Sequence, residues 1–221
     1  MVPGGSDTQS LVEELERRVE GEVRFDKMTR VLYSTDASIY QVEPIGVVIP
    51  RSAEDAIAVI ETAHRFDVPV LPRGGGTSLA GQTVGRAIVI DFSKYMRNVI
   101  EVNAEEGWAR VQPGVILDEL NRHLEPHGMM FAPDPSTSNR GNVGGAVGNN
   151  SCGAHSIVWG KTVDNVLEMD VVLADGQTAR FSPLDGAGLE AKMRTAGLEG
   201  DIYRQLFAIG EANRDEVLKR Y

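Results

Sequence analysis

The stretch PVLPRGGGTSLAG, residues 69–81, places three consecutive glycines directly behind a segment with the apolar pattern of a β-strand. Glycine loses more conformational freedom on folding than any other residue, so the run at residues 74–76 needs a physical reason. One reason is close approach of a ligand, because successive N–H groups of a bare backbone can converge on an anion. Thr77 and Ser78 add hydroxyl groups at the same place. The composition favours a phosphate-binding loop, and a tight multi-glycine turn is the alternative.

Two common phosphate-binding motifs do not fit this loop. A Walker loop carries a lysine directly after its last glycine, and no lysine follows the glycines here. The dinucleotide fingerprint Gly-x-Gly-x-x-Gly opens a long helix, and that spacing is absent as well. The loop is therefore expected to belong to another class of nucleotide-binding fold.

The segments around the loop predict an α+β fold. A strand at 45–49, a helix at 52–66 and a strand at 68–71 form a predicted βαβ unit. Ser52 is the expected N-cap of that helix, with Asp55 reaching back to complete a capping box. The later alternation is too irregular for a doubly wound sheet. The other predicted elements are strands at 87–91, 99–102, 108–111, 166–173 and 179–181, a turn at 174–177, and helices at 7–20, 115–124 and 201–220.

A second glycine-rich segment spans residues 130–166 and suggests a second loop built for the same purpose. It opens with Pro133-Asp134-Pro135, where each proline disfavours a helical conformation of the residue before it. NVGGAVGNN, residues 142–150, then predicts a short helix stripped of side-chain bulk. Such a surface can press against a flat ring, and its asparagines offer short hydrogen-bonding groups. A flavin isoalloxazine ring fits this composition.

Charge and composition exclude several classes of protein. The 221 residues include 22 Lys and Arg and 32 Asp and Glu, a formal net charge of −10, which argues against general nucleic-acid binding. No apolar run reaches the ~18–20 residues of a transmembrane segment, and the N-terminus lacks a secretion-signal pattern. The single cysteine permits no internal disulfide, so a cytoplasmic location is expected, with membrane association only through partners. His123 and His127 have a metal-like spacing without a third ligand, so no metal site is predicted.

Six motifs in fixed order resemble the FAD-binding (PCMH-type) module of the vanillyl-alcohol oxidase / p-cresol methylhydroxylase superfamily. Within it, the resemblance is closest to the FAD-linked D-2-hydroxyacid dehydrogenases, of the glycolate oxidase, D-lactate dehydrogenase and D-2-hydroxyglutarate dehydrogenase types. It covers about residues 25–182. The motifs are YSTDASIYQVEPIGVVIPRSAEDA (33–56), PRGGGTSLAGQ (72–82), VQPGVILDELNRHL (111–124), PDPSTSNRGNVGGAVGNNSCG (133–153), WGKTVDNV (159–166) and EMDVVLADG (168–176).

The resemblance implies two small α/β subdomains with FAD between them. These would be residues 25–105 and 106–183, preceded by a tail and helix at 1–24 and followed by a linker and helix at 184–221. The diphosphate of FAD would lie on the first loop, the flavin and its ribityl chain on the second, and the adenosine near its end. The implied cofactor positions are Pro72, Arg73, Gly74, Gly75, Gly76, Thr77, Ser78, Leu79 and Gln82; Pro133, Asp134 and Pro135; Gly144, Gly145, Gly148, Asn149, Ser151, Cys152 and Gly153; and Gly160 and Val166.

Departures from the family pattern shape the expected function. Some relatives attach the flavin to a histidine just after the glycines; Thr77 stands there, so non-covalent FAD is implied. The cap domain that would carry the substrate-binding and catalytic residues is not found, so the chain is expected to be an N-terminal fragment that is inactive alone. One cysteine cannot build an iron–sulfur cluster. Cys152 is expected to pack beside the flavin rather than act as a redox thiol, and His155 to be a hydrogen-bonded loop residue.

The implied activity is oxidation of a small D-2-hydroxy acid to a 2-oxo acid by hydride transfer to N5 of the flavin. The substrate would bind through the absent cap domain, and the electron acceptor would be a quinone, an electron-transfer protein or an iron–sulfur domain. Three alternatives remain open: a stand-alone FAD-binding subunit that relays electrons, a non-catalytic nucleotide-binding module, and a cell-wall sugar-nucleotide reductase of the same FAD fold.

Overall fold

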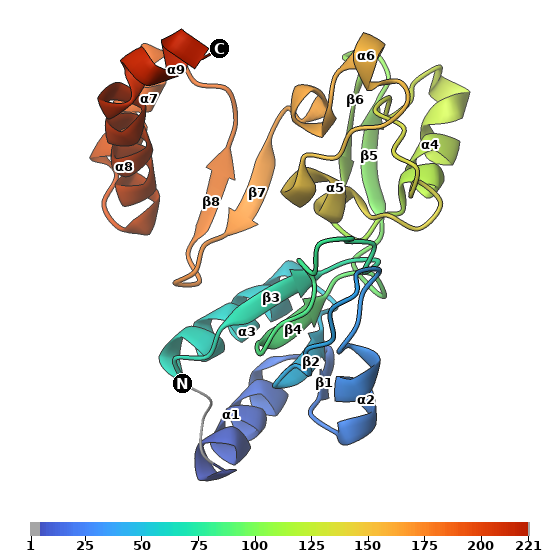
Figure 1. Cartoon of the computed structure of the whole chain (residues 1–221), viewed down its shortest axis with the longest axis vertical. Coiled ribbons are helices and arrows are strands. Elements are labelled where there is room, and N and C mark those ends of the chain that lie inside the picture. Colours follow the sequence, from blue (N-terminus) through green and yellow to red (C-terminus); the bar gives the residue numbers. More distant parts are fainter. Residues whose placement is uncertain (1–4, 221) are drawn as a thin grey trace. The chain divides into compact units, whose positions relative to one another are not determined.

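A computed structural model of the chain describes residues 5–220, with side chains from Thr8 onward. The chain forms two compact units, one ending at Val166 and the other beginning at Leu167. The larger unit contains a four-stranded sheet with its helices and a β-hairpin with shorter helices (Figure 1). Both glycine-rich segments, up to Val166, lie in this larger unit.

The sheet of the larger unit has the strand order β1-β2-β4-β3. Its strands are β1 (Glu22–Arg24), β2 (Gly46–Ile49), β3 (Val70–Arg73) and β4 (Ile88–Asp91). The predicted βαβ unit forms, since β2 and β3 run in the same direction, but β4 is inserted between them and pairs with both. The carboxyl ends of these three strands meet at one edge, so the loop after Arg73 leaves the sheet beside Asp91. The antiparallel β1 was not predicted, because three residues are too short for a period-2 pattern.

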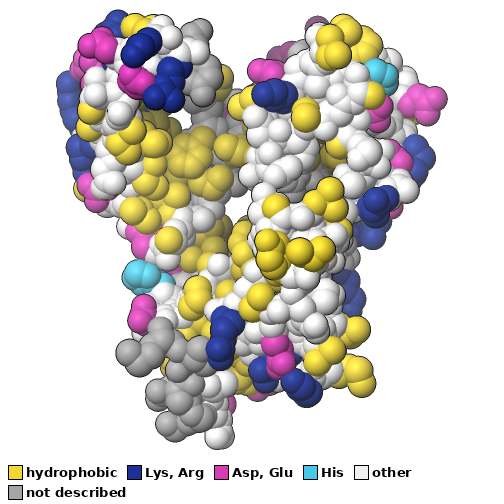
Figure 2. Space-filling model, viewed as in Figure 1, with side chains coloured by type: hydrophobic (Ala, Val, Ile, Leu, Met, Phe, Trp, Pro, Cys, Tyr) yellow, Lys and Arg dark blue, Asp and Glu magenta, His cyan; other side chains and the backbone are white. Residues whose placement is uncertain are grey.

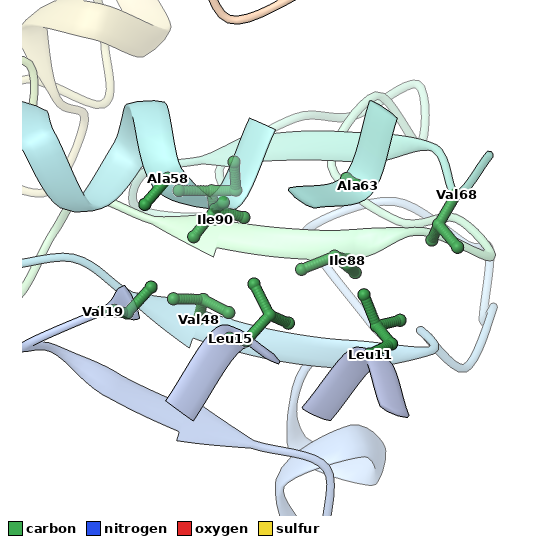
Figure 3. Close-up of a cluster of buried hydrophobic side chains, with 10 residues drawn as sticks. Leu11, Leu15, Val19, Val48, Ala58, Ala63, Val68, Ile88 and Ile90 are labelled. Atoms are coloured by element: carbon green, nitrogen blue, oxygen red, sulfur yellow. The ribbon is translucent and has the colours of Figure 1, made fainter. Parts of the chain in front are cut away.

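The core of this sheet follows from strand alternation. Val48, Ile88 and Ile90 face the helices α1 (Gly5–Arg18) and α3 (Ala53–Arg65), whereas their neighbours Val47 and Val89 face the opposite side. Figure 3 shows Leu11 and Leu15 of α1 beside the strand residues Val48 and Ile88. Both leucines are fully buried, as the predicted stripe requires, and each contributes about 1.5–3 kcal/mol of burial free energy. The helix α2 (Lys27–Leu32) is a further element that was not predicted.

The start of α3 corrects one part of the predicted capping box. Ser52 is the N-cap and its hydroxyl accepts a hydrogen bond from the backbone N–H of Asp55, as expected. The carboxylate of Asp55, however, accepts from Arg51 rather than from Ser52. It also accepts from the backbone N–H groups of Glu20 and Gly21, which join α1 to β1. Asp55 therefore stabilises contacts that are distant in sequence.

Replacing Asp55 by asparagine is expected to destabilise the chain by about 2 kcal/mol. The side chain of Asp55 is 3% exposed, and the amide NH₂ of asparagine cannot accept from the backbone donors that one carboxylate oxygen serves. Urea unfolding followed by circular dichroism measures the change. Glu16→Ala, at an exposed position of α1, is the matched control and should change the free energy of unfolding little. Equal stability of the two variants would contradict this role of Asp55.

An ionic cluster beside β1 predicts a pH dependence of stability. Hydrogen bonds from Lys94, Tyr95 and Arg24 hold the pKa of Glu22 near 2, below its ordinary value of 4.5. A carboxyl with a lowered folded-state pKa stabilises the fold above its unfolded-state pKa, and this contribution disappears as pH falls from about 4.5 to about 2. The wild type should therefore lose more stability over this range than Glu22→Gln. Urea midpoints measured from pH 6 to pH 2 test this, and parallel profiles of the two proteins would contradict it.

The rest of the larger unit follows Asp91. The strands β5 (Val99–Asn103) and β6 (Trp108–Val111) form an antiparallel pair, covered by α4 (Leu117–Leu124). Val115, Leu120 and Leu124 are buried against this pair, as the apolar pattern predicts. The 3₁₀ turn η1 (Glu125–His127) precedes the second glycine-rich segment, which then forms α5 (Val143–Asn149), α6 (Ser156–Trp159) and the 3₁₀ turn η2 (Thr162–Asn165).

As far as Arg220, the smaller unit contains a hairpin and three helices. The strands β7 (Met169–Val172) and β8 (Thr178–Phe181) pair across the predicted turn at 174–177. The polar segment after Pro183 contains α7 (Gly186–Arg194), which was not predicted. The expected helix at 201–220 is instead α8 (Leu198–Ala212) and α9 (Arg214–Arg220), separated at Asn213. The side chain of Asn213 donates to the carbonyl of Ile209 and so caps the end of α8.

Two classes of protein considered above, nucleic-acid-binding and membrane-spanning proteins, can be compared with the structure. In Figure 2, Lys and Arg side chains are interspersed with Asp and Glu side chains on the face shown, so positive charge is not continuous there. Within residues 5–220, no helix has the length and apolar character needed to cross a bilayer.

Candidate functional site

The first glycine loop presents free backbone donors at the carboxyl edge of the sheet. None of the six N–H groups of residues 74–79 donates a hydrogen bond to another residue of the described chain. Gly76 has φ +63°, a left-handed conformation that glycine adopts without strain. Its carbonyl accepts from the N–H of Ala37, which ties the loop to an earlier segment of the chain. The loop can therefore donate to an anion without losing an internal hydrogen bond.

The hydroxyl and amide side chains of this loop have different roles. Ser78 is occupied within the loop: its hydroxyl donates to Gln82 and accepts from the N–H groups of Ala80 and Gln82. The side chain of Thr77, by contrast, has no hydrogen-bond partner in residues 5–220. Of the two predicted hydroxyl donors, Thr77 is thus the one available to a ligand.

The structure brings the two glycine-rich segments together. The side chain of Gln82 donates to Asn149 over 3.1 Å, which links the first loop to the end of α5. The glycines of the first loop allow the second segment to approach: a Cβ on Gly74 would lie 2.6 Å from Oδ1 of Asn142, and one on Gly75 would lie 2.4 Å from the carbonyl oxygen of Arg140. The two glycine-rich segments therefore contact each other in the fold.

Asn142 is a central residue of this contact that the sequence did not single out. It is 4% exposed, and its Nδ2 donates to the carbonyl of Gly114 over 2.6 Å. Its Oδ1 is buried against Gly74 and accepts no hydrogen bond from the described residues. An asparagine directly before a short helix is an N-cap signal that could have drawn attention to it, although its side chain does not cap α5 here.

The helix α5 exposes a face without side-chain bulk. Gly145, Gly148 and Asn149 are exposed, and a Cβ on either glycine would meet no atom within 4 Å. Gly144 lies on the opposite side, where a Cβ would be 2.8 Å from Pro113. The three predicted glycines of α5 thus separate into one that allows packing and two that keep open space beside the helix.

The segment 133–135 lies against residues 151–156. A Cβ on Gly153 would be 1.8 Å from the carbonyl oxygen of Asp134, and the same carbonyl accepts from the N–H of Ala154. Asp134 has φ +51°, an uncommon conformation for a residue with a side chain. His155 lies 3.4 Å from Oδ2 of Asp134, so it is a loop residue with a polar partner, as expected. Cys152 is exposed on the same segment.

The other predicted positions lie at the borders of the site. Pro133 and Pro135 are buried and Ser151 accepts from Thr162, so these three shape the backbone of the segment. Pro72 and Leu79 are exposed at the two ends of the first loop. Gly160 has φ +75° and packs against Asp164. Gly160 and Val166 have no hydrogen bond to the first loop among the described residues.

Similarity to known proteins identifies the family of this chain. The model of a family described as FAD binding domain matches residues 44–182, more than half of the chain. The chain belongs to this FAD-binding family. Its FAD-binding domain therefore includes the parallel strands β2, β3 and β4, both glycine-rich segments and the hairpin β7–β8.

The FAD-binding domain has well-matched relatives among longer proteins. The chain is 42% identical to a D-2-hydroxyglutarate dehydrogenase of Pseudomonas putida over 200 residues, which are 89% of this chain and 20% of the relative. It is 34% identical to the glycolate oxidase subunit GlcD of Bacillus subtilis, over 84% of this chain and 41% of the relative. The chain thus spans between about a fifth and two fifths of the length of these relatives.

Solved structures with the same fold are more distant in sequence. An alkyldihydroxyacetonephosphate synthase superposes with a TM-score of 0.71 at 23% identity, over 80% of this chain and 35% of that chain. A p-cresol methylhydroxylase superposes with a TM-score of 0.66 at 19% identity, over 80% of this chain and 36% of that chain. These likenesses establish the α+β fold of PCMH-type FAD-binding proteins.

The residues present are compatible with FAD. The free N–H groups of residues 74–79 match a diphosphate, which accepts several hydrogen bonds at once. The bare face of α5 matches a flat ring, because nothing projects from Gly145 or Gly148. The contact between Gln82 and Asn149 brings these two surfaces next to each other.

Proposed function

We propose that this chain binds FAD non-covalently and that it is the flavin-binding part of an oxidoreductase that acts on D-2-hydroxy acids. The observation that carries the proposal is the row of free N–H groups at residues 74–79, which faces no protein acceptor in the described chain. Thr77 follows the glycines, and threonine does not form the histidyl attachment on which covalent relatives depend.

In this proposal, each glycine-rich segment holds a different part of the cofactor. Backbone N–H groups of the first loop, with the hydroxyl of Thr77, donate to the diphosphate. Gly145, Gly148 and Asn149 contact the flavin and its ribityl chain, while the buried Pro133 and Pro135 hold the backbone beside them. Gly160 and Val166 lie toward the adenosine. The segments 25–105 and 106–183 are the two subdomains that flank FAD.

The relatives support the proposed substrate class. Both the D-2-hydroxyglutarate dehydrogenase and the glycolate oxidase subunit act on 2-hydroxy acids, as their names state. Bound FAD would supply the acceptor for the hydride that leaves the α-carbon of such an acid. The residues of this chain would orient that cofactor, and the electron acceptor would be a quinone, an electron-transfer protein or an iron–sulfur domain.

An absorption spectrum tests cofactor binding. Purified chain incubated with FAD and freed of excess ligand is expected to show the visible bands of a flavin. Acid precipitation should release all of the flavin into solution, since no covalent bond holds it. Flavin retained in the precipitate would contradict the non-covalent mode, and absence of flavin after incubation would contradict the proposed function.

A titration distinguishes which part of FAD the chain recognises. FAD is expected to bind at least about a hundredfold more tightly than riboflavin, because charge-assisted hydrogen bonds to the diphosphate contribute about 1.5–3 kcal/mol each. ADP, which shares the diphosphate, should compete with FAD. Equal affinity for FAD and riboflavin would show that the chain does not recognise the diphosphate, which would contradict a role for the first loop.

A further inference from the structure

We propose that Arg73 is a positioning residue whose guanidinium holds the first glycine loop in its anion-binding shape, without contacting the anion itself. This inference rests on the proposed function and deepens it, because it names the side chain that orders the loop before the cofactor binds. The proposed role belongs to the side chain of Arg73, whereas the resemblance to the family implies binding through the backbone of the loop.

The guanidinium of Arg73 joins three backbone carbonyls from two separate segments. Its Nη1 donates to Tyr33 over 3.2 Å and to Thr83 over 3.1 Å, and its Nη2 donates to Thr35 over 2.8 Å. Arg73 stands at the start of the loop and Thr83 at its end, so one side chain closes the loop. Tyr33 and Thr35 belong to a segment about 40 residues earlier, which the same group fixes across the loop.

Further contacts hold the guanidinium in this position. It lies over the ring of Tyr33, 5.2 Å from the ring centre. The hydroxyl of Tyr33 donates to Asp91 over 2.6 Å, and burial together with Asp91 raises the pKa of this tyrosine above its ordinary value. Asp91 pairs in register with Arg73 on the neighbouring strand. The sheet, the tyrosine and the arginine thus form one connected support beneath the loop.

The same contacts engage the guanidinium with acceptors of the protein itself. Three of its N–H bonds are directed to carbonyl oxygens, and the loop backbone covers it, because a Cβ on Gly76 would lie 2.7 Å from Nη2. Arg73 forms no ion pair with a carboxylate of residues 5–220. Its positive charge therefore has no direct carboxylate partner among these residues and favours an anion bound at the loop.

Lysine cannot reproduce this arrangement. A guanidinium is a planar fork with fixed donors, whereas an ammonium is a single point of charge on a flexible chain. Arg73→Lys keeps the charge and loses the bridge between Tyr33, Thr35 and Thr83, while Arg73→Gln loses both. The two substitutions therefore separate positioning of the loop from the effect of charge.

The experiment combines hydrogen exchange of the chain without cofactor and titration with FAD. The reporter is the amide of Ala37, which donates to the carbonyl of Gly76 over 3.0 Å and is protected only while the segment at 33–37 lies across the loop. In both Arg73 variants, exchange at Ala37 should accelerate at least about tenfold. FAD affinity should fall at least about tenfold, and riboflavin affinity should change less. Arg97→Gln is the control, because Arg97 forms an exposed ion pair with Glu119 far from the loop in sequence.

Every outcome either supports or contradicts the proposed role of Arg73. Wild-type exchange at Ala37 in both variants would overturn it, as would full FAD affinity in Arg73→Lys, which would show that charge alone suffices. If Arg73→Gln does not fold, judged by circular dichroism, Arg73→Lys carries the test. If the wild type binds no FAD, the proposed function fails, and the exchange at Ala37 still decides whether Arg73 orders the loop.

Discussion

Alanine at Gly145 and Gly148 of α5 is expected to weaken FAD binding by about tenfold to a hundredfold while leaving the chain folded. A Cβ at either position meets no protein atom within 4 Å, so neither substitution disturbs packing in the absence of cofactor. Alanine in place of glycine within a helix is even expected to stabilise the fold by about 0.5–1 kcal/mol. The same methyl group enters the space proposed for the flavin, where overpacking costs about 1–3 kcal/mol of binding free energy.

The measurement compares urea unfolding of the free chain with titration by FAD. Gly210→Ala is the matched control, because Gly210 lies in α8, also has open space at its Cβ, and is not part of the proposed site. It should share the small gain in stability and keep the FAD affinity of the wild type. If Gly148→Ala and Gly210→Ala bind FAD equally well, the flavin does not lie against this face of α5.

Alanine at Gly153 is expected to have the opposite effect, destabilising the chain itself by about 3 kcal/mol. Its Cβ would lie 1.8 Å from the carbonyl oxygen of Asp134 and 2.5 Å from that of Pro133. Both neighbours are backbone atoms, and the carbonyl of Asp134 also accepts the hydrogen bond from Ala154, so neither can move cheaply. The substitution must therefore separate the segment 133–135 from residues 151–156.

Thermal and urea unfolding of the chain without cofactor test this expectation. Gly148→Ala, five residues earlier and without any clash, is the internal comparison. We expect FAD binding to be lost in Gly153→Ala as a consequence of the displaced segment. A Gly153→Ala chain as stable as the wild type would show that the close approach to Asp134 is not required.

The two experiments assign different reasons to glycines that look alike in sequence. NVGGAVGNNSCG contains four glycines within twelve residues, and nothing local distinguishes them. In the fold, Gly144 and Gly153 allow other parts of the chain to approach, whereas Gly145 and Gly148 face open space. A glycine that makes room for the protein affects folding, and one that makes room for a ligand affects binding.

Much of the fold could be predicted because its signals are local. The capping residue Ser52 follows from a local capping pattern of four residues. The stripe of Leu11 and Leu15 and the leucines of α4 follow from helix periodicity, which depends only on residues three and four apart. The short elements β1 and α2 were missed because a few residues are too short for a period to appear. The break at Asn213 was missed because apolar residues continue on both sides of it.

The candidate site was predicted in its residue types and only in part in its arrangement. Both glycine-rich segments were identified, since bare backbone has few other uses. Asn142 was not, because its importance comes from its burial between Gly74 and Gly114 rather than from its neighbours in sequence. Ser78 was expected to offer a hydroxyl to the ligand, but its hydroxyl bonds within the loop, which local composition does not reveal.

The sequence by itself determined that this chain has an α+β fold with two glycine-rich segments suited to FAD. Glycine runs, helix caps and apolar periodicity depend only on residues that are close together in the sequence. Only the tertiary structure decided that β4 lies between β2 and β3, that Gln82 meets Asn149, and that the guanidinium of Arg73 turns toward Tyr33, Thr35 and Thr83. The physical reason is that each of these contacts joins groups brought together by packing, through hydrogen bonds and steric limits that no local pattern contains.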